Sequence, residues 1–145
     1  MRDHLAQGRL CRDGLLQPEA AAELMARVEA EGIETLRMLF ADAHGILRGK
    51  TVTRRGLEGA LKAGLRVPST LLLKDLSHRT VFPIWSEAGD TPMAGASDVM
   101  LVPRVETFPP LPHAPHSAMI LCRVLRTDGS AIPFVPETLL QGAVD

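Results

Sequence analysis

The stretch LFADAHGILRGK, residues 39–50, decides the fold. Apolar side chains alternate in the segment that leads into it, which is the period of a strand with one buried face. Asp42 and Gly45 favour a tight turn, after which the chain continues as a second extended segment. The stretch therefore predicts an antiparallel hairpin. Its second strand carries Arg48 and Lys50, which lie either on a solvated face or against a ligand or partner.

A helix is predicted on each side of this hairpin. Pro18 suits the first helical position, an apolar stripe follows it at helical spacing, and Gly32 ends the helix. Thr53 is expected to cap the second helix, which ends at Gly64. Residues 1–15 show no clear period and are expected to fray.

Three more strands are expected, over residues 70–76, 99–102 and 118–125. Residues 77–97 have no period, and a connection of this length is usually functional or disordered. Pro136 begins a last helix, whose apolar residues would normally pack against something.

The order of these elements predicts an α+β roll of the β-grasp or ubiquitin-like kind. We expect a mixed sheet of about five strands with a crossing helix, preceded by an N-terminal helix. Residues 1–32 form the expected N-terminal helical segment, 33–135 the β-grasp domain, and 136–145 the start of a helix leading to an absent further domain. The chain stops inside that helix, which we interpret as a cut through a longer protein.

Composition limits the classes of function. A chain of 145 residues with 46% hydrophobic and 23% charged residues predicts one folded domain. A net charge of −1 argues against a general nucleic-acid binder. Cys11 and Cys122 lack a disulfide pattern, and the sequence has neither a signal peptide nor an apolar run of about 18 residues. We expect a cytoplasmic protein without nucleic-acid or membrane partners.

Four basic residues gather in the eight positions 48–55, namely Arg48, Lys50, Arg54 and Arg55. Charge on a strand edge is ordinarily solvated, and it also guards against aggregation. However, the two arginines of the cluster's second half would stand at a helix N-terminus, where positive charge is unfavourable. Contact with an anion or with an adjoining domain is therefore the alternative interpretation.

The histidines do not predict a metal site. His113 and His116 lie close together in sequence, but no third or fourth ligand accompanies them. His44 and His78 are isolated and are expected in solvent, while Cys122 alternates with apolar residues and is expected in the core.

Three stretches in the same order resemble the glutamine synthetase family. LFADAHGILRGKTV (39–52) resembles the family's first hairpin, which has an Asp-x-x-Gly turn followed by Arg-Gly-Lys. SDVMLVPRVETFPPLPHAPHSAMILCRV (97–124) is similar to the family's later strands. DGSAIPFVPETLL (128–140) is similar to the turn and Pro-led helix that lead into the catalytic domain. The resemblance covers about residues 33–145.

This resemblance implies the amino-terminal β-grasp domain of a ligase that joins glutamate to ammonia or an amine through γ-glutamyl phosphate. ATP and Mg or Mn would bind to the carboxyl-terminal catalytic domain of the parent protein. The resemblance therefore implies no catalytic residue, cofactor or metal in this chain, which is expected to be inactive alone. Its implied partners are that catalytic domain and the neighbouring subunits of a homo-oligomer.

In the family, a neighbour's β-grasp domain covers the active site with a loop that carries Asp-Gly-Ser-Ser in ammonia-using members. Here Ser69 and Thr70 match the two hydroxyl positions, but Val67 occupies the Asp position. The resemblance thus favours an organic amine over ammonia, with both hydroxyl residues as possible inter-subunit contacts at the substrate pocket. Trp85, in the long connection, is either a plug on its own domain or such a contact.

Two alternatives stay open. The chain could be a free-standing β-grasp module that binds a partner or acts as a scaffold. It could also come from a catalytically inactive family member that serves as a sensor.

Overall fold

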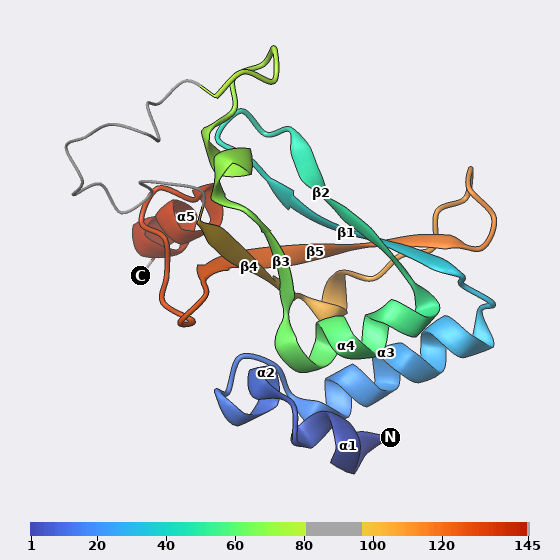
Figure 1. Ribbon diagram of the computed structural model, residues 1–145. Coiled ribbons are helices and arrows are strands. Elements are labelled where there is room, and N and C mark those ends of the chain that lie inside the picture. Colours follow the sequence, from blue (N-terminus) through green and yellow to red (C-terminus); the bar gives the residue numbers. More distant parts are fainter. Residues whose placement is uncertain (81–96, 145) are drawn as a thin grey trace.

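The computed structural model describes residues 1–80 and 97–144, in which a five-stranded mixed sheet forms the centre (Figure 1). The strands are β1 (Thr35–Ala41), β2 (Leu47–Thr53), β3 (Leu65–Pro68), β4 (Asp98–Pro103) and β5 (Ser117–Arg126). The helices are α1 (Arg2–Ala6), α2 (Arg9–Arg12), α3 (Pro18–Ala30), α4 (Arg54–Ala63) and α5 (Pro136–Val144), with 3-10 helices η1 (Ser69–Leu73) and η2 (Val105–Thr107).

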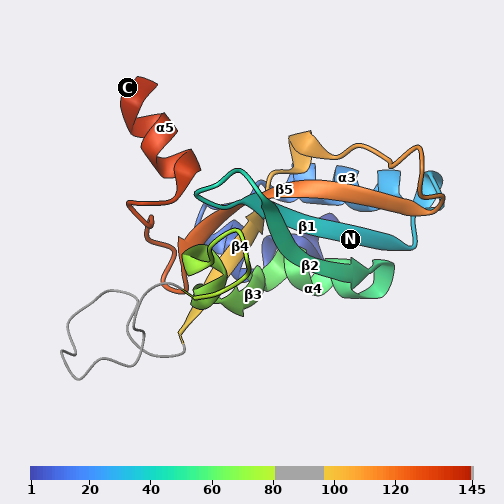
Figure 2. The same ribbon diagram turned by 90° about the horizontal axis from the view of Figure 1, so that it is seen from above.

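The sheet has the strand order β2-β1-β5-β4-β3. β1 pairs antiparallel with β2 and parallel with β5, and the remaining pairs, β5 with β4 and β4 with β3, are antiparallel. α3 and α4 lie side by side on one side of the sheet, with α1 and α2 beyond them (Figures 1 and 2). This arrangement confirms the predicted α+β, β-grasp-like fold.

The predicted first hairpin is confirmed. Oδ1 of Asp42 accepts hydrogen bonds from the backbone amides of His44 (2.8 Å) and Ile46 (2.9 Å), so its side chain builds the turn. Gly45 has a φ of 77°, which glycine adopts without a steric penalty. The alternating apolar residues of β1 are buried as predicted, namely Leu36, Met38 and Phe40.

Both predicted helices have their expected ends. Pro18 occupies the first turn of α3. The side chain of Thr53 accepts a hydrogen bond from the amide of Gly56, which caps α4, and Gly64 ends that helix with a φ of 76°. The inward-facing residues of α4 are Leu57, Ala60 and Leu61, all buried.

The expectation that residues 1–15 fray is wrong. They form α1 and α2, and Leu5 and Leu10 are fully buried in the same apolar cluster as the sheet residues. Two helices of five and four residues are too short to show a helical period. The link between them packs closely: a Cβ on Gly8 would lie 2.7 Å from the Cα of Lys62.

The expected strand over 70–76 is also wrong, because the strand lies earlier and η1 occupies most of that range. Gly64 turns the chain at once, so β3 begins at Leu65 and buries Val67. Ser69 and Leu72, three residues apart, are both buried, which is the spacing of a 3-10 turn rather than a strand.

The helix predicted from Pro136 is present as α5, but its apolar side chains are exposed. They are Leu139, Leu140 and Val144. Within residues 1–80 and 97–144, no helix is long and apolar enough to cross a membrane. The domain boundaries at 33 and 136 stay predictions, and most of the 77–97 connection lies outside the described residues.

Candidate functional site

The first of the four clustered basic residues, Arg48, is buried instead of solvated, with 5% of its surface exposed. The antiparallel register places Arg48 opposite Phe40, and opposite residues in such a pair share one face of the sheet. Because Phe40 faces the core, Arg48 does so too. Of the two alternatives for Arg48, the solvated one is therefore wrong, and its pairing with Phe40 in the hairpin was the signal that could have shown this.

Arg48 is paired with a buried carboxylate. Its Nε donates to Oδ2 of Asp42 at 2.5 Å, while the other oxygen of Asp42 accepts the two turn amides. Burial raises the pKa of Asp42, but the hydrogen bond from Arg48 and those from the amides of His44 and Ile46 outweigh it, so the pKa lies below the ordinary value. Asp42 therefore carries its charge at neutral pH.

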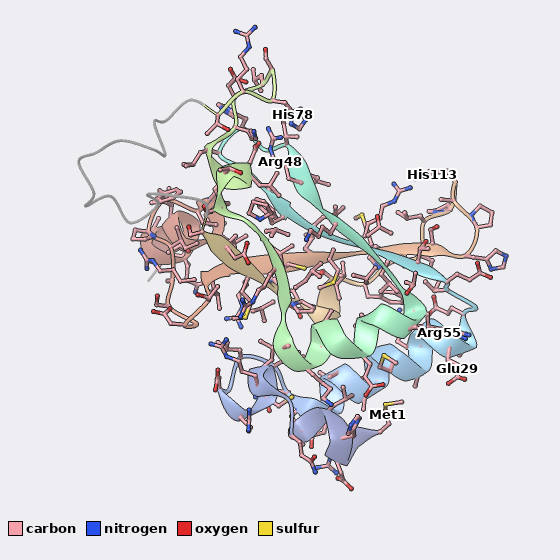
Figure 3. The ribbon with its side chains drawn as sticks, in the orientation of Figure 1. Met1, Glu29, Arg48, Arg55, His78 and His113 are labelled. Atoms are coloured by element: carbon pink, nitrogen blue, oxygen red, sulfur yellow. The ribbon has the colours of Figure 1, made fainter. Side chains whose placement is uncertain are left out.

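The guanidinium of Arg48 also reaches a second turn, in residues 75–79. Its Nη2 donates to the backbone carbonyl of Asp75 at 3.3 Å, and its Nη1 lies 3.0 Å from Nδ1 of His78 (Figure 3). Since a guanidinium can only donate, the unprotonated ring nitrogen of His78 accepts. His78 is exposed, as predicted, but its ring also contacts Arg48.

The 75–79 turn is built in the same way as the hairpin turn. Oδ1 of Asp75 accepts hydrogen bonds from the amides of Ser77 and Arg79, both at 2.8 Å. The amide of His78 donates to the Asp75 carbonyl, and His78 has a φ of 63°. Arg48 therefore joins two turns that are each organised by an aspartate. Neither Asp75 nor His78 was singled out by sequence reasoning as a partner of Arg48.

Lys50 points to the same part of the molecule but stays exposed. Its Nζ donates to the carbonyl of Arg66 in β3 at 2.9 Å. β2 and β3 are the two edges of the sheet, so this contact brings the edges together and gives the sheet a nearly closed shape. The structure thus places both basic residues of β2 against residues 66–75.

That same region contains the two predicted hydroxyl contacts. Ser69 is fully buried, its amide donates to the carbonyl of Ser97 at 2.8 Å, and its Oγ accepts from Oγ of Ser97 at 3.0 Å. Thr70 is partly exposed. Of the two residues, only Thr70 offers its side chain at the surface of this chain.

Arg54 and Arg55 lie apart from this region, at the N-terminus of α4. Both are exposed and line a groove of about 410 Å³ between α3 and α4. Figure 3 labels Arg55, Glu29 and Met1, which border it. The sequence cluster of four basic residues is therefore two separate groups in space.

The other sequence candidates are placed as follows. Trp85 lies outside the described residues. His116 Nδ1 lies 3.0 Å from the carbonyl of Gly32, and His113 lies in the loop before β5 (Figure 3). Burial raises the pKa of the Cys122 thiol to about 12, so this predicted core residue stays protonated. Within the two described ranges, no three His, Cys, Asp or Glu side chains gather as a metal site would require.

Comparison with known proteins identifies two relatives, although no protein-family model matches the chain. The chain is 28% identical over 134 residues to a gamma-glutamylanilide synthase from Acinetobacter sp, covering 88% of this chain and 27% of the relative. It is 26% identical over 119 residues to a glutamate–isopropylamine ligase from Pseudomonas sp, covering 81% of this chain and 25% of the relative. The chain thus spans about a quarter of the length of these relatives.

Solved structures share the fold. A GmaS–ADP complex gives a TM-score of 0.58 at 23% identity, covering 82% of this chain and 24% of the other. GmaS without ligand gives 0.61 at 22% identity, covering 81% and 24%. A glutamine synthase homolog gives 0.58 at 21% identity, covering 77% and 26%. With the two relatives, these structures confirm the resemblance of the chain to an amino-terminal β-grasp domain of the glutamine synthetase family.

Proposed function

We propose that this chain is the β-grasp domain of an ATP-dependent ligase that joins glutamate to an organic amine. The observation that carries the proposal is the similarity of this chain to a gamma-glutamylanilide synthase and a glutamate–isopropylamine ligase. The two alignments cover 88% and 81% of this chain. ATP and Mg or Mn would bind in a catalytic domain outside this chain. The chain alone would therefore be inactive.

The choice of an amine over ammonia rests on Val67. This residue stands where ammonia-using members of the family carry an aspartate, and here it is fully buried in β3 opposite Val99. An apolar side chain in the core offers no charge to a small ammonium ion.

The role proposed for the chain is to complete an active site between subunits of a homo-oligomer. The segment after β3 supports this role, because it carries Thr70 at the surface and is fixed by contacts from β2 and from Ser97. Thr70 would contact the neighbouring subunit near the substrate. The exposed apolar side chains of α5 would be covered by the catalytic domain, since an apolar surface of this kind favours burial.

The proposal is tested on the full gene product from its source cells. Its intact mass, measured by immunoblot and mass spectrometry, is expected to be several times the 15.7 kDa of this chain. A native product of 15.7 kDa would overturn the proposal and favour a free-standing β-grasp module. In that case partners would be sought by pull-down through the 77–97 segment.

A further inference from the structure

The segment between β3 and Thr80 is held at both ends by contacts from distant parts of the chain. At its start, Ser69 is fixed by two hydrogen bonds to Ser97. At its end, the 75–79 turn is fixed by the guanidinium of Arg48. η1, which carries Thr70, lies between these two attachments.

The chemistry of the second attachment depends on arginine. A guanidinium has five donors in a rigid, planar fork, and here they reach Asp42 in one turn and both Asp75 and His78 in the other. A lysine ammonium at the same position would keep the charge but would have no planar fork to span both turns.

Stability alone does not explain this arrangement. A buried ion pair is expensive to desolvate, and well-packed apolar residues of similar volume are often as stable or more stable. The hairpin turn is already closed by Asp42 through the amides of His44 and Ile46. What the pair adds is a fixed position for a second, exposed turn.

We propose that Arg48 is a positioning residue, which holds the 75–79 turn against the β1–β2 turn and thereby fixes the end of η1. Asp42 orients the guanidinium, and the Asp75 carbonyl and the His78 ring are the groups that it positions. In the proposed ligase, which this part of the inference assumes, Arg48 would act on the amine site through Thr70 without touching the substrate.

The first experiment measures hydrogen exchange in the full chain with Arg48→Met and Arg48→Lys. The reporters are the amides of Ser77, His78 and Arg79, all bonded to Asp75. We expect their protection to fall about tenfold in both variants, because a lost hydrogen bond is worth about that factor. Arg48→Lys keeps the positive charge beside Asp42. This variant therefore carries the test if Arg48→Met does not fold.

The matched control is Arg126→Met. Arg126 also bonds a turn, through Ala131 O and Ser130 Oγ, but this turn follows β5 and these bonds do not reach residues 75–79. Arg126→Met should leave the hydrogen-exchange protection of the 77–79 amides unchanged. Unchanged protection of 77–79 in the Arg48 variants, or an equal loss at every amide of β1 and β5, would overturn the positioning role.

Chemical rescue separates positioning from simple packing. In Arg48→Ala, free guanidinium at a low, non-denaturing concentration should restore protection of the 77–79 amides, while methylammonium should not. Equal rescue by both cations would contradict the requirement for a planar fork.

A kinetic experiment on the full gene product tests the link to the amine site. Arg48→Lys is expected to raise the KM for the amine about tenfold or more, with a smaller change in the KM for ATP. An equal change in both KM values would overturn this link. If the unaltered protein shows no ligase activity, the proposed function fails, while the exchange and rescue results still decide the role of Arg48.

Discussion

Arg48 and Asp42 form an ion pair in which 3% and 1% of the two side chains are exposed, with Nε of Arg48 2.5 Å from Oδ2 of Asp42. The pair lies at the end of the sheet where the β1–β2 turn meets the 75–79 turn (Figure 3). It is therefore the point at which the hairpin that defines the fold contacts the segment that carries the candidate site.

Removing one partner of this pair should be costly. Arg48→Met leaves Asp42 as a buried charge without its partner, and the expected loss in the free energy of unfolding is about 3–5 kcal/mol. Urea denaturation followed by circular dichroism measures this loss. Arg126→Met removes only exposed hydrogen bonds to Ser130 and Ala131 and should cost less than about 1 kcal/mol. A loss of the same size in both variants would show that Arg48 has no special role.

The lowered pKa of Asp42 predicts how stability depends on pH. The unfolded chain binds a proton more readily than the folded one, so Asp42 stabilises the fold above its ordinary pKa of 3.8. This contribution is lost as the pH falls through the lower pKa of the folded state. We expect the difference in the free energy of unfolding between the unaltered chain and Asp42→Asn to be largest near pH 7. This difference should shrink below pH of about 4. A difference that is constant down to acidic pH would contradict this assignment.

Gly49, between Arg48 and Lys50, is required by a close approach of the two hairpin strands. A Cβ at this position would lie 1.9 Å from the carbonyl oxygen of Met38. Gly49→Ala should therefore separate β1 from β2 and destabilise the chain by more than about 2 kcal/mol.

Gly59, in α4, is the matched control because a Cβ there meets nothing within 4 Å. Gly59→Ala should stabilise the chain by about 0.5–1 kcal/mol, since alanine is the better helix former. Thermal unfolding measures both variants. Similar melting temperatures for the two alanine variants would show that the hairpin tolerates a side chain at Gly49.

The thiol of Cys122 should be unreactive in the folded chain. Burial raises its pKa to about 12, so hardly any thiolate forms at pH 8. Alkylation with iodoacetamide, followed by peptide mass spectrometry, should modify Cys122 only after denaturant is added. Rapid modification under native conditions would mean that β5 opens readily.

Much of the fold could be predicted, because its strongest signals are local. The alternation in β1, the Asp42–Gly45 turn and the capped ends of α4 each depend on residues close together in sequence. The N-terminal helices were missed, since they are too short to show a period. β3 was placed too late in the sequence, since three consecutive leucines, residues 71–73, resemble a strand but form a 3-10 turn.

The candidate site was harder to predict, because it depends on contacts between distant residues. Arg48 was identified from its position beside Lys50, but its burial follows from pairing with Phe40 and its role from Asp75 and His78, some 30 residues away. The sequence places four basic residues in one run, while strand and helix geometry separate them into two groups.

The most direct test of the proposed function uses the full gene product with glutamate, ATP, Mg²⁺ and either isopropylamine, aniline or ammonium. The products are measured by mass spectrometry of the γ-glutamyl amide and by release of ADP. We predict ATP-dependent amide formation that is faster with an organic amine than with ammonium. ADP release without any γ-glutamyl product, or no reaction with any of the three nitrogen donors, would contradict the assignment of this chain to a γ-glutamyl-amine ligase.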